Sequence, residues 1–127
     1  MGRSDDYQWL FRKAPMMATA IDEDGRFLDV NDAVERRLGF TRDEMIGRKP
    51  LDFVTAESAH RIHEEFRPAL RRTGKLENKP LSFVAKSGEV VDCLSDAIIE
   101  YDPEGRFVRT IAMYAEVTDQ ARAAFKY

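Results

Sequence analysis

The chain has 127 residues, 34% of them charged, and its 23 acidic and 20 basic side chains give a formal net charge of -3. This length suits one domain that buries roughly two-thirds of its unfolded surface, and the composition excludes a basic nucleic-acid-binding protein. No apolar run approaches the ~20 residues of a membrane span. The single cysteine rules out an internal disulfide and is typical of a reducing compartment, so we expect the cytoplasm.

The first predicted element is a short helix over residues 4–14, which Pro15 ends. Four aromatic or apolar side chains stand on this otherwise polar helix: Tyr7, Trp9, Leu10 and Phe11. One interpretation is that they pack on their own domain. The other is that they form a contact between two copies of the chain, and we name them as candidate dimer contacts.

A short β-hairpin follows the first helix. Residues 17–21 and 26–30 predict two strands, joined by an acidic turn in which Gly25 can accept a positive φ. Asn31 is placed to cap a helix over residues 32–38. This part of the chain therefore predicts two strands that lead directly into helix.

Further short helices lead to the longest helix of the chain. Thr41 and Glu44 form a capping box for one more turn of helix. Residues 55–72 then predict a helix with one apolar stripe at helical spacing. Pro68 cannot donate its backbone hydrogen bond, so we expect a kink or early fraying there.

Three strands complete the predicted core. Residues 76–86 form the first, and Pro80 favours an edge position or a bulge near its start. Residues 90–101 and 107–118 form a long hairpin around a turn that contains Pro and Gly. Alternate residues of its first arm are small or apolar and are assigned to the core. Both faces of the second arm are fairly apolar, which predicts that something also covers the outer face.

This order of elements resembles a PAS domain, the sensory module of bacterial signalling proteins. The resemblance runs from about Leu10 to Asp119. The segments that carry it are AIDEDGR (20–26), VNDA (30–33), LGFTRDEMIG (38–47), KSGE (86–89), DPEGR (102–106) and EVTD (116–119). It implies an α+β fold, with a five-stranded antiparallel sheet in the order 2-1-5-4-3, helices on one face and an N-terminal flanking helix. We divide the chain into a flanking helix (1–15), a PAS core (16–119) and the start of a C-terminal signalling helix or linker (120–127).

The resemblance also implies a function. Such domains sense and dimerise within signal-transduction proteins, beside histidine kinase, cyclic-dinucleotide or transcription-factor output domains. The motif Glu116-Val117-Thr118-Asp119 matches the one through which the last strand hands over to a signalling helix, and it is the candidate signal relay. We expect a homodimer, an output domain in the same polypeptide and a small-molecule ligand. We expect no enzymatic activity of the domain itself, no nucleic acid and no membrane contact.

Two alternatives stay open, a haem-based gas or redox sensor and a protein–protein adaptor with a filled, ligand-free core. Some PAS relatives bind haem through a histidine of the long helix. Here His63 borders the apolar stripe and is the candidate ligand, whereas His60 lies outside the stripe and is the second candidate. A solvated histidine and no cofactor is the simpler interpretation.

Flavin photochemistry in the family uses a cysteine in an Asn-Cys-Arg motif on a helix. Cys93 lies on a predicted strand without this motif, so we expect a small buried side chain and no flavin–cysteine adduct. If the core holds a pocket, its predicted lining is Ile62, His63, Phe66, Phe83, Cys93, Ser95 and Met113. Mostly apolar walls suit a small, modestly polar ligand, although the two phenylalanines are large enough to fill the space. No arrangement typical of a catalytic triad, a phosphate-binding loop or a zinc site is present.

Overall fold

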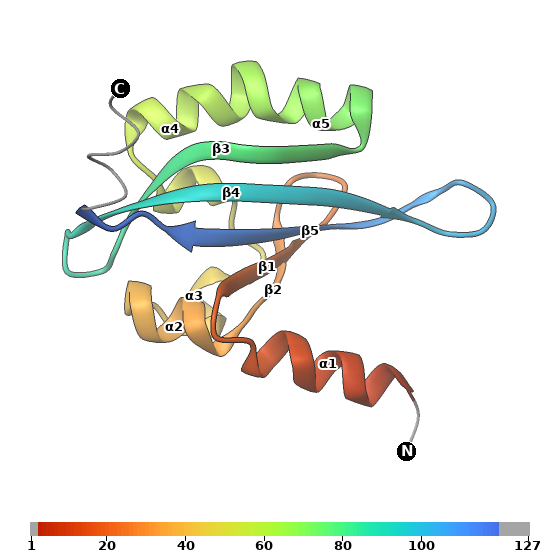
Figure 1. Cartoon of the computed structure of the whole chain (residues 1–127), viewed down its shortest axis with the longest axis horizontal. Coiled ribbons are helices and arrows are strands. Elements are labelled where there is room, and N and C mark those ends of the chain that lie inside the picture. Colours follow the sequence, from red (N-terminus) through yellow and green to blue (C-terminus); the bar gives the residue numbers. More distant parts are fainter. Residues whose placement is uncertain (1–2, 120–127) are drawn as a thin grey trace.

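The computed structural model describes residues 3–119. Its elements follow the predicted order (Figure 1). They are α1 (Arg3–Lys13), β1 (Met17–Ile21), β2 (Phe27–Val30), α2 (Asp32–Leu38), α3 (Arg42–Met45), the 3-10 turn η1 (Pro50–Phe53), α4 (Ala56–Arg61), the π-helical segment η2 (Ile62–Phe66), α5 (Arg67–Thr73), β3 (Lys75–Val84), β4 (Val90–Tyr101) and β5 (Phe107–Glu116).

The five strands form one antiparallel sheet in the order β2-β1-β5-β4-β3, which confirms the predicted fold class. The hairpin of β4 and β5 lies at its centre, with Ala97 opposite Ala112 and Ser95 opposite Tyr114. On the other side of β5, Thr19 lies opposite Ala112. Directly opposed residues of antiparallel strands share a face, so these five side chains all belong to one face of the sheet.

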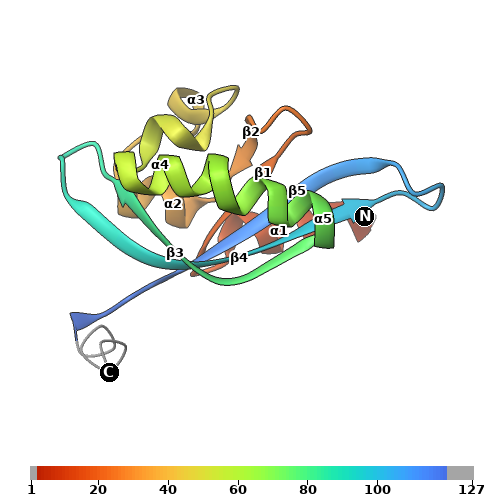
Figure 2. The same cartoon turned by 90° about the horizontal axis from the view of Figure 1, so that it is seen from above.

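The helical layer covers that inner face, as the view from above shows (Figure 2). The hydrophobic core lies between the two layers. Its most deeply buried large side chains come from both layers: Phe27 and Phe83 from the sheet, and Leu38 and Met45 from the helices. The whole core cluster extends from Met17 to Tyr114, so it joins residues from most of the described chain.

Local capping fixes the start of the short helices, as the sequence predicts. The buried Asn31 accepts a hydrogen bond from the amide of Val34 (3.3 Å) and another from the amide of Ala18 (3.0 Å), so it ties α2 to β1. At α3 the amide of Glu44 donates to the Thr41 hydroxyl (3.2 Å), and the amide of Thr41 donates to the Glu44 carboxylate (2.8 Å). Both donors of the capping box are thereby satisfied.

The long helix continues past Pro68, so the predicted fraying is wrong. The segments α4, η2 and α5 follow one another from Ala56 to Thr73. In η2 the amide of Arg67 donates to the carbonyl of Ile62, five residues earlier, as in a π turn. This wider turn lies directly before the proline and keeps the helix unbroken through it. The predicted position of Pro80 is confirmed, because β3 is an edge strand whose register shifts between Leu76 and Lys79.

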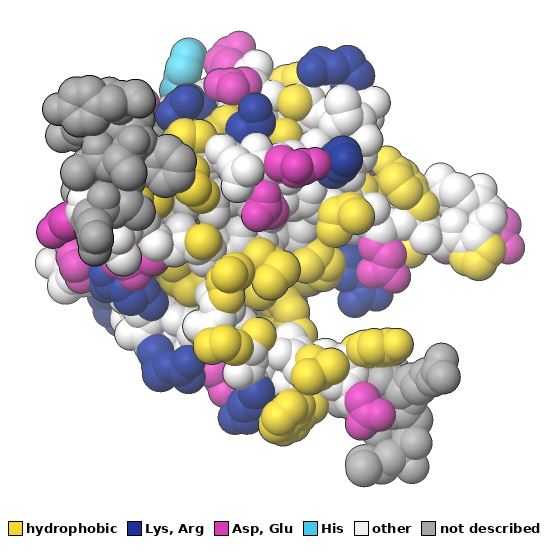
Figure 3. All heavy atoms as spheres, in the orientation of Figure 1, with side chains coloured by type: hydrophobic (Ala, Val, Ile, Leu, Met, Phe, Trp, Pro, Cys, Tyr) yellow, Lys and Arg dark blue, Asp and Glu magenta, His cyan; other side chains and the backbone are white. Residues whose placement is uncertain are grey.

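The outer face of the sheet is open at its middle. Ile98 and Met113 are 58% and 42% exposed there, and Val90 at the start of β4 is 53% exposed. Figure 3 looks at this face and shows hydrophobic side chains over the middle of the sheet and along α1. Residues 3–119 do not supply the predicted cover. No helix within residues 3–119 combines the length and the apolar character that crossing a membrane requires.

Candidate functional site

A cavity of about 420 Å³ lies between the inner face of the sheet and the helical layer. Its apolar walls come from β1, η1, the long helix and the last three strands: Ile21, Leu51, Ile62, Phe66, Leu70, Leu76, Leu81, Ala97, Phe107 and Ala112. A volume of this size with mostly apolar walls is typical of a small-molecule site. The core is therefore hollow at this end, unlike the filled core of the adaptor alternative.

The predicted pocket residues divide into three groups. Ile62, Phe66 and Ser95 lie in the cavity wall. Phe83 and Cys93 are buried in the filled part of the core, where the Phe83 ring packs edge-on against Tyr114 with centroids 4.9 Å apart, and neither is among the lining residues. The third group, Met113 and His63, points away from the cavity.

The prediction for Met113 is wrong, because this side chain lies on the open outer face. Met113 is paired with Ala18 of β1 and Asp96 of β4, whereas the neighbouring positions Ala112 and Tyr114 line the cavity. Both faces of β5 are apolar in sequence, so periodicity alone did not decide which of them points inward.

Both histidines lie on the exposed side of the long helix, so the prediction that His63 faces the pocket is wrong. Only Ile62 and Phe66 are buried between residues 60 and 66, and the narrow stripe excludes His63 as well as His60. The described lining residues include no histidine, cysteine or methionine. The residues present therefore do not fit a haem held by the long helix.

Hydroxyl groups form the polar part of the cavity floor. The hydroxyls of Tyr114 and Thr19 share a buried hydrogen bond of 2.9 Å. Burial raises the pKa of Tyr114 to about 12, so the phenol stays neutral. Ser95 and Thr110 are buried and line the cavity, and neither side chain has a hydrogen-bond partner within residues 3–119. Their hydroxyls are available to a ligand.

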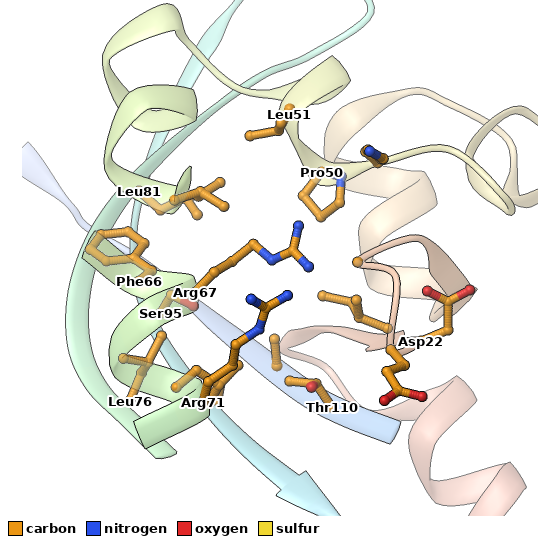
Figure 4. Close-up of a pocket in the computed structure, with 18 of the residues that line it drawn as sticks. Asp22, Pro50, Leu51, Phe66, Arg67, Arg71, Leu76, Leu81, Ser95 and Thr110 are labelled. Carbon is orange, nitrogen blue, oxygen red and sulfur yellow. The ribbon is translucent and has the colours of Figure 1, made fainter. Parts of the chain in front are cut away.

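Two arginines of α5 stand at the mouth of the cavity. Figure 4 shows the guanidinium groups of Arg67 and Arg71 pointing from α5 across the opening toward the turn that carries Asp22. Arg67 also lies against the backbone of Gly25, where a Cβ would be only 3.0 Å from its Nη1. Gly25 has φ +84°, which favours glycine for the backbone, and a side chain at this position would also press on the Arg67 guanidinium. This pair was not predicted as part of a site, although the four-residue spacing of the two arginines on one helix was an available signal.

At the far end of β5, ion pairs hold the predicted relay to the core. Arg37 Nε donates to Oε1 of Glu116 (2.7 Å), and Arg37 Nη1 donates to Oε1 of Glu89 (3.0 Å). These hydrogen bonds raise the pKa of Arg37 and lower the pKa of both carboxylates. The amide of Val117 donates to the carbonyl of Asp92 (2.8 Å). Arg37 therefore connects α2 with the start of β4 and the end of β5.

The last two relay residues, Thr118 and Asp119, are exposed. The proposed signalling helix over residues 120–127 lies outside the described residues. No group of three or more histidine, cysteine, aspartate or glutamate side chains in the described part of the chain is arranged to hold a metal ion.

The N-terminal helix presents its aromatic side chains to solvent. Tyr7, Trp9 and Leu10 are 64%, 62% and 55% exposed, and Phe11 is half-buried. The last turn of α1 is anchored by ion pairs, from Arg12 to Asp29 (3.2 Å) and from Lys13 to Asp32 (2.9 Å). The hydrogen bond from Lys13 lowers the pKa of Asp32. The helix is thus held at its end while its apolar side chains remain uncovered by residues 3–119.

Cys93 has the character of a structural side chain. It is 2% exposed, and burial raises its pKa to about 12, with the charges of Glu116 and Asp92 as smaller causes. A thiol of such high pKa is not a nucleophile near neutral pH.

Comparison with known proteins relates these features to a family. The sequence model of the family described as "PAS fold" matches residues 11–122. A comparison with curated proteins gives no match. Among solved structures, a PAS domain from Colwellia psychrerythraea superposes with a TM-score of 0.82 at 17% identity, covering 92% of this chain and 98% of that one.

Two further structures show the same likeness. A light-oxygen-voltage domain superposes with a TM-score of 0.80 at 18% identity, covering 98% of this chain and 96% of that one. A PAS domain from a two-component sensor histidine kinase gives 0.74 at 15% identity, with 90% and 96% covered. At such low identity these likenesses establish the fold alone.

Proposed function

Because the chain belongs to the PAS family, we propose that it is the sensory module of a signal-transduction protein, with a small molecule as its signal. PAS domains are generally non-catalytic sensory modules. The observation that carries the proposal is the cavity of about 420 Å³ between sheet and helices, whose floor presents the hydroxyls of Ser95 and Thr110. The apolar walls supply affinity and the polar groups supply orientation.

The signal leaves the cavity along β5. Thr110, Ala112 and Tyr114 line the cavity, and Glu116 follows two residues later on the same strand. A ligand that shifts β5 also changes the geometry at the end of this strand. There the strand is held to the core by Arg37 and by the hydrogen bond from the Val117 amide. The next segment, residues 120–127, is the proposed connection to an output domain in the same polypeptide. A histidine kinase is one candidate, since one structural neighbour is a PAS domain of such a protein.

Titration of the ¹⁵N-labelled domain with 1-octanol tests this proposal, because the probe has an apolar body and one hydroxyl. We expect shifts of the amide resonances around the cavity and at Val117. Ala97→Leu fills part of the cavity and should weaken binding at least tenfold. Ala56→Leu adds the same atoms at an exposed position of α4 and should leave binding unchanged. Binding that survives Ala97→Leu, or no shift at the cavity, would contradict the proposal.

A second part of the proposal is that the domain forms a homodimer through α1. PAS domains commonly dimerise, and the exposed Tyr7, Trp9 and Leu10 give this helix an apolar surface without a partner in residues 3–119. We further propose that residues 1–15 act as a flanking helix, residues 16–119 as the sensory core, and that the domain works in the cytoplasm.

Sedimentation velocity at about 1–100 µM protein, an order of magnitude on either side of a dissociation constant of about 10 µM, measures the dimer directly. Leu10→Glu should convert the dimer to a monomer, whereas Gln8→Glu adds the same charge on nearly the opposite side of the same helix and should not. A monomeric protein at the highest concentration would count against the proposal.

A further inference from the structure

We propose that the ligand of this cavity is a small amphipathic anion, whose carboxylate or phosphate head is bound by Arg67 and Arg71 while its apolar body enters the cavity. This inference rests on the proposed function, because it requires the cavity to be a ligand site. It adds the chemical class of the ligand, which the apolar walls alone do not indicate.

The first observation is the direction of the two side chains. Arg67 and Arg71 both line the cavity, and both guanidinium groups point into its mouth (Figure 4). They stand four residues apart in α5, on the same side of the helix. Two planar guanidinium groups brought together in this way match the geometry of carboxylate or phosphate oxygens, to which arginine donates paired hydrogen bonds.

The second observation is that both charges lack a partner in the described part of the chain. Within residues 3–119 neither Arg67 nor Arg71 forms an ion pair or a side-chain hydrogen bond. Like charges four residues apart repel one another and destabilise a helix. Other arginines of this chain, such as Arg37 and Arg42, have carboxylate partners at 2.7 and 2.6 Å. An anion at the mouth would remove the repulsion and satisfy both groups.

The remaining charges at the mouth leave an excess of positive charge. Lys49 adds a third cation to the lining, while Asp22 and Glu23 are its two carboxylates. Asp22 stabilises its own turn, because its Oδ1 accepts hydrogen bonds from the amides of Asp24 and Arg26, both at 2.9 Å. It is therefore less available as a counter-ion for the arginines.

The position of Arg67 argues against a role in helix stability. Basic side chains in the last turn of a helix stabilise it by interacting with the negative end of its dipole. This accounts for the positions of Arg71 and Arg72, but not for that of Arg67 in the middle of the continuous helix. In the π turn the Arg67 amide donates a hydrogen bond to the carbonyl of Ile62, and the Ile62 side chain also lies in the cavity wall. π turns within helices are frequently found at functional sites.

The apolar body of the proposed ligand would lie against the apolar residues of the cavity wall. Figure 4 shows Phe66, Leu76 and Leu81 on the side of the cavity from which the Arg67 and Arg71 side chains start. Arg67 is half-buried and Arg71 is exposed, so a head group bound there stays at the solvent boundary. A charged head held at the mouth and a carbon chain directed inward avoid the desolvation of an unpaired charge in the core.

Three probes with one alkyl chain separate charge from shape: octanoate, octyl phosphate and 1-octanol. Their dissociation constants are measured by the same amide-shift titration. We expect at least one of the two anions to bind tenfold or more tightly than 1-octanol. Arg67→Gln/Arg71→Gln should bring that ratio to within about twofold, because the anions lose their charged partners and 1-octanol has no charge to lose. Arg72→Gln removes the same charge from the adjacent position outside the cavity and should preserve the ratio.

Far-UV circular dichroism establishes that each variant is folded, and Arg71→Gln alone serves if the double variant is not. If all three probes bind equally and Ala97→Leu weakens all of them, the cavity is a ligand site and only the preference for anions is wrong. If the anions prefer the wild type but Arg72→Gln abolishes that preference as strongly as the double variant, the assignment to Arg67 and Arg71 fails. If none of the probes binds, the proposed function fails together with this inference.

Discussion

Replacing Tyr114 by phenylalanine removes one hydroxyl from the floor of the cavity and leaves the ring in place. The lost group is half of the 2.9 Å hydrogen bond with Thr19, and Thr19 is fully buried. No other side-chain hydrogen bond of the Thr19 hydroxyl occurs within residues 3–119. Tyr114→Phe therefore leaves a buried polar group without a partner, which typically costs about 1–3 kcal/mol of the free energy of unfolding.

The reverse substitution, Thr19→Val, leaves the phenol of Tyr114 without a partner and should cost a similar amount. The double variant contains neither hydroxyl, so its cost should be well below the sum of the two single costs. We expect a coupling free energy of about 2 kcal/mol between these residues. Urea unfolding followed by far-UV circular dichroism measures it. With an m-value of about 1.5 kcal/mol/M, a loss of about 2 kcal/mol lowers the midpoint by about 1.3 M.

Additive costs in the double variant would refute this reasoning, because two groups that stabilise each other cannot act independently. A Tyr114→Phe variant with wild-type stability would refute it as well. Because both substitutions keep nearly the volume of the native side chain, a collapse of the cavity does not explain either result.

Three further predictions concern the turns, the capping box and the end of β5. Gly25→Ala and Gly105→Ala each force a side chain into positive φ, and each should lower the free energy of unfolding by about 1 kcal/mol, measured by thermal unfolding. Only Gly25→Ala should also weaken octanoate binding, since its Cβ would lie 3.0 Å from the Arg67 guanidinium group. The hydrogen bond from Lys86 is the main cause that lowers the pKa of Glu44 from 4.5 to about 2. The ionised Glu44 therefore stabilises the folded state fully above pH 4.5, and this contribution is lost as the pH falls through about 2. Urea midpoints between pH 5 and 2 should therefore fall less steeply in Glu44→Gln, and equal slopes would contradict the assignment. Arg37→Gln should lower the free energy of unfolding by less than about 1 kcal/mol, because its ion pairs are partly exposed. It should nevertheless speed hydrogen exchange at the Val117 amide, which lies next to Glu116. Unchanged exchange at this amide would argue against Arg37 as the anchor of β5.

The local structure of this protein can be predicted from its amino-acid order. Caps and turns depend on residues a few positions apart, so Asn31, the Thr41–Glu44 box and both Asp-x-x-Gly turns identified the element boundaries to within about two residues. The sheet order did not follow from these local signals; it was implied by the resemblance of their order and motifs to the PAS family, and the structure confirms it. What binds in the core was not predictable in this way, since a pocket depends on distant residues.

Three features depend on contacts between distant segments: which face of β5 points inward, whether the core is filled, and which charges meet at the mouth. Met113 and Ala112 belong to opposite faces of an apolar strand, and the pairing with β1 and β4 selects between them. Phe83 is buried in the filled part of the core, while the cavity remains between the other side chains of the sheet and the helices. Which of the two holds at a given place depends on how side chains from distant segments pack together. Arg67 meets Gly25 because the long helix crosses the end of the first hairpin, a contact between segments far apart in the chain that no local spacing encodes.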